Sequence, residues 1–135
     1  MCFHSRRRAG NAILECGLCM LIFLTIFIAI IEFGMGIYTY NFTSYAAREG
    51  ARYASTRGSL SASPATSTTV ETMIRNQVVA LDSSLVSVTT TWNQGNSNTP
   101  GNTVTVAVSY QITPILGFLL GNITVGATST MMIAQ

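Results

Sequence analysis

The sequence has no lysine, and only 9% of its 135 residues are charged. The small formal net charge of +2 is concentrated in three consecutive arginines, Arg6 to Arg8, and there is no basic patch elsewhere. Nucleic-acid binding needs a broad positive surface, so the sequence predicts no nucleic-acid partner. His4 is the only histidine, and the sequence contains no Ser, His and acid constellation and no glycine-rich phosphate loop. We therefore predict that the protein is not an enzyme.

The three cysteines all lie near the N-terminus, at Cys2, Cys16 and Cys19. The C-terminal part therefore has no disulfide and must fold by packing alone. Cys16 and Cys19 have the C-x-x-C spacing of redox pairs and half zinc sites. However, they lie inside an apolar run and have no second pair, so we interpret them as small residues that pack between helices. No metal or other cofactor is predicted.

One long apolar run dominates the N-terminal third, and no charged residue occurs between Cys16 and Ile31. A helix from Glu15 to Glu32 is roughly 25 Å long, and its uncharged flanks extend it to about the thickness of a bilayer core. We predict a single membrane-spanning helix. The arginines before it and Glu32 after it favour a cytoplasmic N-terminus and an external C-terminal part. Glu15 is costly inside such a segment unless a partner meets its charge.

The helical pattern continues to about Arg57, because alanines are frequent there and no proline interrupts it. Aromatic residues recur on one side of this extension. We expect this aromatic stripe to be amphipathic, and we expect Tyr45 and Tyr53 to pack against the C-terminal part. The members of the stripe are Tyr38, Phe42, Tyr45 and Tyr53.

A second, shorter helix is predicted after a loop at residues 58–69 that offers nothing to pack. Thr68 and Glu71 have capping-box spacing, and apolar residues then recur at helical intervals as far as Leu81. Asp82 and the two serines after it end this helix.

The remaining sequence alternates between apolar and polar residues, which is typical of strands. Three strands are expected, at residues 86–92, 104–112 and 123–133, with a turn at 93–102 and a compact apolar connection at 114–121. The fold class is therefore α+β: a long N-terminal transmembrane helix continues into a small head with a short second helix and a three-stranded antiparallel sheet. We expect a basic leader at 1–10, the helix at 11–57 and the head at 58–135.

Several motifs indicate a family. A basic leader ending at Gly10, followed by Glu15 and an apolar helix, resembles a type IV prepilin. The runs Ile31-Glu32-Phe33-Gly34 and Ala46-Ala47-Arg48-Glu49-Gly50-Ala51-Arg52-Tyr53-Ala54 are more specific. They are similar to the TadE-like family, which comprises minor pilins and pseudopilins of tight-adherence pilus systems.

The resemblance implies a structural subunit that is cut between Gly10 and Asn11 by a prepilin peptidase in the bacterial cytoplasmic (inner) membrane. It assigns Glu15 and Glu32 to assembly. The implied partners are membrane lipid, the peptidase, other pilus or pseudopilin subunits and the inner-membrane assembly platform. The family motif also suggests a subunit contact formed by Arg48, Glu49 and Arg52. The alternative interpretation is a solvated helix face with an intrahelical ion pair between Glu49 and Arg52.

A different class of function also fits the composition. The chain would then be a stable single-pass anchor that carries a binding or adhesive head and is not processed. This alternative explains the apolar helix and the polar strands, but it leaves the spacing between Gly10 and Glu15 unexplained.

Overall fold

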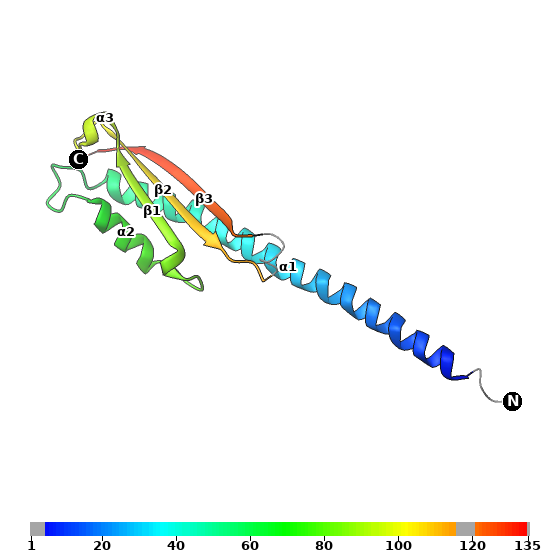
Figure 1. Ribbon diagram of the computed structural model, residues 1–135. Coiled ribbons are helices and arrows are strands. Elements are labelled where there is room, and N and C mark those ends of the chain that lie inside the picture. Colours follow the sequence, from blue (N-terminus) through cyan, green and yellow to red (C-terminus); the bar gives the residue numbers. More distant parts are fainter. Residues whose placement is uncertain (1–4, 116–120, 135) are drawn as a thin grey trace. The chain divides into compact units, whose positions relative to one another are not determined.

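The computed structural model describes residues 5–115 and 121–134. By their contacts the residues form two compact units, Met1–Met35 and Gly36–Gln135. The elements confirm the predicted α+β class (Figure 1). In chain order they are α1 (Ser5–Ser55), α2 (Ser67–Asn76), the 3₁₀ helix η1 (Ser83–Leu85), β1 (Val86–Trp92), α3 (Asn93–Asn96), β2 (Thr103–Ile112) and β3 (Ile123–Met132).

Helix α1 begins at Ser5, inside the segment predicted to be a leader, and ends at Ser55. Gly34 and Gly36 do not interrupt it, although glycine costs about 1 kcal/mol relative to alanine in a helix interior. The part of α1 after Met35 belongs to the same compact unit as the strands, which we call the head unit.

The three strands form one antiparallel sheet in the order β1-β2-β3. The register places Val86 opposite Tyr110, and Val104 opposite both Trp92 and Met131. The predicted turn between the first two strands contains a single helical turn, α3, and Gly95 and Gly101 have positive φ angles of 87° and 88°. Glycine is favoured at both positions because it has no Cβ to clash in this conformation. Side chains of β2 alternate between buried and half-buried, as the sequence predicts.

One face of the sheet is covered by α2 and by the later turns of α1, and Figure 1 shows α2 beside β1. The residues of α1 that face this core are all small and recur at three- and four-residue steps. The sheet and α2 contribute larger residues, including Ile74 and Val106. The small residues of α1, which we call the small-residue stripe, are Thr39, Thr43, Ala46, Ala47, Gly50, Ala51 and Ala54.

The predicted role of the aromatic stripe is therefore partly wrong. Tyr45 is 61% exposed and does not belong to the core, whereas Phe42 and Tyr53 are half-buried at its border. The reason is distance: at Gly50, α1 lies so close to α2 and β2 that a Cβ would crowd Ile74 and Val106, and small residues occupy the other buried positions of the helix. Tyr38 stays on the surface, where its hydroxyl donates to the Val79 carbonyl at 2.7 Å.

The cap of α2 also differs from the prediction. The N-cap is Thr66, not Thr68: its side chain accepts from the backbone N–H of Thr69, while the Thr69 hydroxyl accepts from the Thr66 N–H at 2.8 Å. Glu71 instead pairs with Arg75 at 2.9 Å, one turn further along the helix. Thr66 and Thr69 are three residues apart, as are Thr68 and Glu71, so the capping-box spacing alone does not decide which threonine is the N-cap.

Helix α2 ends at Asn76 rather than near Leu81. Ala80 has a φ of 60°, a left-handed conformation that cannot continue a right-handed helix. Val78 and Leu81 nevertheless pack against the core, which explains why their spacing resembles a helical pattern.

The loop between α1 and α2 is packed, contrary to the expectation. Ala65 is buried in the core, and the Asn98 side-chain amide donates to the carbonyls of Arg57 and Ala65 at 3.2 and 3.0 Å. Arg57 in turn lies 4.4 Å above the centre of the Tyr53 ring. Most of the apolar connection predicted at 114–121 lies outside the described residues.

Gly50 marks the closest approach of α1 to the rest of the head unit. A Cβ at this position would lie 2.9 Å from Ile74 Cδ1 and 3.1 Å from Val106 Cγ1. We expect Gly50→Leu to lower the free energy of unfolding by about 2 to 3 kcal/mol, because α1 must move away from α2 and β2. Denaturant unfolding of the full chain in detergent, followed by fluorescence of the single tryptophan, measures this change.

Gly36→Leu is the matched control for that change, since a Cβ at Gly36 has no neighbour within 4 Å. Equal unfolding curves for the two variants would contradict the close packing of α1 against the sheet.

Candidate functional site

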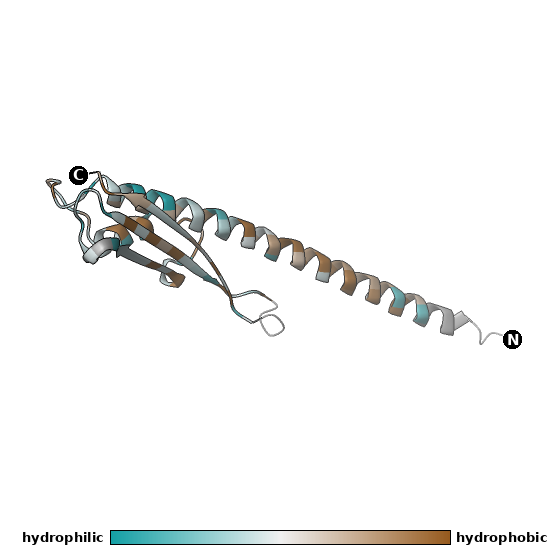
Figure 2. Cartoon of the chain, turned by 90° about the horizontal axis from the view of Figure 1, so that it is seen from above, coloured by the Kyte–Doolittle hydropathy of each residue, from teal (hydrophilic) through white to brown (hydrophobic). Residues whose placement is uncertain are grey.

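The first unit of the chain contains the apolar part of α1. Among the described residues, one helical stretch, Asn11–Ser55, is long and apolar enough to cross a membrane, and none of its most apolar window, of mean hydropathy 2.6, is buried. The apolar side chains are instead exposed. In Figure 2, where the ribbon is coloured by residue hydropathy, this part of α1 is mostly brown. The Thr25 hydroxyl donates to the Leu21 carbonyl at 2.8 Å, so it needs no water. The segment is consistent with a single-pass membrane anchor.

Glu15 lies near the start of this apolar segment, and its side chain is exposed on α1. Gly10 and Asn11 precede it in the same helix, so the predicted cleavage point lies about 6 to 8 Å from Glu15 along the helix axis. The salt bridges found among described side chains are Glu49–Arg52 and Glu71–Arg75, and neither involves Glu15. The assignment of Gly10, Asn11 and Glu15 to processing and assembly stays a prediction.

Cys16 and Cys19 are free and exposed, and they lie three residues apart on α1. Among the described residues, no group of three or more His, Cys, Asp or Glu side chains is placed to hold a metal ion. Residues three apart on a helix are neighbours on its surface, so both thiols are presented to whatever surrounds this segment.

The charged residues of the later motif lie on the outside of α1. Arg52 forms a two-point ion pair with Glu49, with distances of 3.0 Å from Nε to Oε2 and 2.6 Å from Nη2 to Oε1. Arg48 is also exposed. Such a pair on a helix surface is screened by solvent, so it contributes little to the stability of the head unit. Its charges remain on the surface, where another subunit could contact them.

Glu32 is half-buried and lies seventeen residues after Glu15, or about 25 Å along α1. The two glutamates predicted to act in assembly are therefore separate sites.

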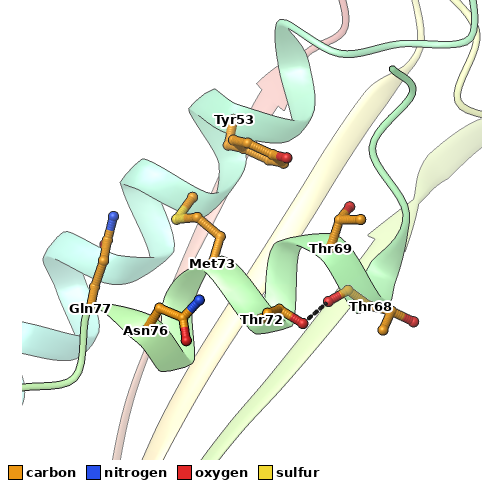
Figure 3. Close-up of a pocket in the computed structure, with 7 residues that line it drawn as sticks. All are labelled: Tyr53, Thr68, Thr69, Thr72, Met73, Asn76 and Gln77. Carbon is orange, nitrogen blue, oxygen red and sulfur yellow. Dashed lines mark hydrogen bonds between the residues drawn. The ribbon is translucent and has the colours of Figure 1, made fainter.

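A pocket of the head unit was not foreseen from the sequence. It opens between α1 and α2, and Figure 3 shows the Thr72 side chain turned toward Thr68, whose carbonyl accepts its hydroxyl at 2.8 Å. The lining has no carboxylate, imidazole or amine, so it provides polar contacts rather than acid–base chemistry. The lining residues are Tyr53, Thr68, Thr69, Thr72, Met73, Asn76 and Gln77.

Comparison with known proteins identifies the N-terminal part of the chain. The family model of the TadE-like protein matches residues 10–52. This segment is TadE-like. The match confirms the resemblance seen in the sequence motifs, and it supports a pilus-associated, pilin-like and structural role. No curated protein and no solved structure matches the chain.

The TadE-like segment contains every site residue predicted from the sequence, from Gly10 to Arg52. It also contains residues whose importance sequence reasoning missed. Within the run from Arg48 to Arg52, the charged residues face outward while Gly50 and Ala51 are buried against α2 and the sheet. The TadE-like motif thus has charged residues on one side of α1, and its small residues on the other side pack against α2 and the sheet. Small residues at helical spacing in this part of the sequence do indicate the face of α1 that packs on the core. The aromatic residues beside them have the same spacing, so the pattern alone does not identify that face.

Proposed function

We propose that this chain is a minor pilin or pseudopilin-like structural subunit that serves the biogenesis of a tight-adherence, type IV-like pilus. The observation that carries the proposal is the TadE-like match over residues 10–52, which coincides with a helix apolar enough to span a membrane. The matched stretch includes both the Gly10-to-Glu15 spacing and the later motif around Gly50. A non-processed anchor with an adhesive head accounts for the helix but not for these motifs.

The proposed location is the bacterial cytoplasmic membrane, crossed once. The basic residues Arg6 to Arg8 precede the apolar run, which favours a cytoplasmic N-terminus and an extracytoplasmic head. The mature subunit then enters a pilus or acts at its membrane base.

The partners follow from this placement. Membrane lipid surrounds the apolar part of α1, whose side chains are exposed. A prepilin peptidase removes the residues before Asn11, and the mature helix then packs against other pilus or pseudopilin subunits and the inner-membrane assembly platform. The proposed contact outside the apolar segment consists of the exposed Arg48 and Arg52 together with the half-buried Glu49.

Gly10→Val tests the processing step. A peptidase that cuts beside a helix needs close approach to the backbone, and a branched side chain at the residue before the cut obstructs it. We expect this variant to keep its leader almost completely. Intact-mass measurement of the chain isolated from its native membrane distinguishes the cut form from the uncut form.

Gly34→Val is the control, because it adds the same side chain to the same helix at a position with no neighbour within 4 Å. Normal removal of the leader from the Gly10→Val chain would eliminate the main support for a prepilin-type substrate.

A further inference from the structure

The sheet of the head unit carries no charge. No Asp, Glu, Lys, Arg or His occurs after Asp82, and all three strands lie beyond that residue. Charged side chains are a common means by which natural proteins keep sheet edges from pairing with another chain. This sheet lacks that protection on every strand.

Strand β3 forms one edge of the sheet, because it pairs with β2 alone. Among the described residues, the backbone hydrogen bonds made outside helices and strand ladders include none from Ile123–Met132. One row of its N–H and C=O groups therefore points away from β2, along a strand of ten residues.

The usual structural protections of an edge are also missing from β3. It contains no proline, and its register with β2 runs without a shift from Ile123 opposite Ile112 to Met132 opposite Thr103, so no bulge twists the edge away. Strand β1, the opposite edge, is shorter, and charged side chains lie beside the segment that leads into it. Arg75 Nη1 donates to the Ser83 carbonyl, and the hydroxyl and backbone N–H of Ser84 hold the pKa of Asp82 below its usual range.

The inner face of β3 is incompletely covered. The side chains that it turns toward the helices are only half-buried, whereas Val104, Val106 and Val108 on the adjacent strand are almost fully buried. Ile123, which begins the strand on the same face, is 44% exposed. A further strand beside β3 would cover this apolar surface. The half-buried inner residues are Val125, Ala127, Ser129 and Met131.

We propose that β3 pairs antiparallel with β3 of a second copy of this chain, so that the two head sheets continue into one. A strand that lies beside its own copy must place like residues near each other, and like charges in such pairs are destabilising. A neutral strand meets this requirement. Pairing centred on Thr128 sets Val125 opposite Met131 of the other copy and leaves threonines on the outer face. The proposal does not depend on the pilus role, so its failure would leave that role untouched.

Cysteine cross-linking tests the pairing in the full chain, in detergent or membranes, after Cys2, Cys16 and Cys19 are replaced by alanine. Thr128 and Thr89 form a matched pair, since both are exposed and both lie in one row across Ala107, on opposite edges of the sheet. With a short bifunctional thiol reagent, we expect Thr128→Cys to give several-fold more covalent dimer than Thr89→Cys. Unchanged tryptophan fluorescence checks that both variants stay folded.

The dependence of the cross-linking yield on the position of the cysteine in β3 tests whether the two strands pair antiparallel. An antiparallel pair brings together residues near the middle of β3, so Thr124→Cys should cross-link less than Thr128→Cys. Dimer from Thr128→Cys that does not exceed the Thr89→Cys level would overturn the proposal. Equal yields at residues 124 and 128 would overturn it too, because pairing centred on Thr128 places residue 124 eight positions along the strand from its own copy.

Discussion

Val106→Asp is expected to unfold the head unit. Val106 has no exposed surface, lies in the middle of β2 and faces Gly50 of α1 at the centre of the core. A carboxylate there would lie in the apolar core cluster, away from water, so it must either stay charged in an apolar environment or take up a proton. We expect a loss of more than about 3 kcal/mol, which is a large fraction of the stability of a domain of this size.

Fluorescence of Trp92 reports this change, because the residue is half-buried at the border of the core and is the only tryptophan. Gln111→Asp is the control: it puts the same charge on the same strand, at an exposed position. If the Val106→Asp chain melts like the control, the inner face of the sheet has been assigned wrongly.

Glu15→Gln is expected to leave cleavage and membrane insertion intact but to abolish incorporation into the pilus or its assembly complex. A carboxylate in a lipid environment costs about 2.5 kcal/mol or more, so it needs a partner. Cleavage after Gly10 would create an ammonium at Asn11, about one helical turn from Glu15 and close to the same face. The ammonium of a neighbouring subunit could then neutralise Glu15 where water is scarce.

Co-purification of the Glu15→Gln chain with other pilus subunits measures that loss, and intact mass confirms that its leader has been removed. Glu71→Gln is the control, since Glu71 lies in α2 and pairs locally with Arg75. Normal co-purification of the processed Glu15→Gln chain would mean that the carboxylate has no partner in assembly.

Much of the head could be predicted because its strands have a simple pattern. In β2, valines at every second position are buried and the residues between them are not, so period-two alternation is sufficient to place the strand and its face. The long helix is equally clear, since its apolar run and its alanine-rich extension contain no proline.

The packing of α1 was harder to predict because two stripes on it have the same period. Tyr45 and Ala46 are neighbours in the sequence, and helical spacing accommodates either on the inner face. What decides between them is the distance from Gly50 to Val106, which depends on how closely the helix approaches the sheet. That distance is a tertiary property, and no local pattern encodes it.

The end of α2 was missed for a related reason. Val78 and Leu81 are apolar because they contact the core, but the backbone at Ala80 has already left the helical conformation. In most segments, apolar residues at helical spacing are both buried and helical. Here Val78 and Leu81 pack against the core but lie beyond the end of the helix. The candidate site residues from Gly10 to Arg52 were predicted from motifs rather than geometry, and they stay predictions; the family match covers the same segment.

The intact mass of the chain isolated from its native membrane tests the central claim most directly. A pilin-like subunit of the tight-adherence type should be found without residues 1–10, with Asn11 as its first residue. A mass that still includes residues 1–10 would contradict this account and would favour a stable membrane anchor with a binding head.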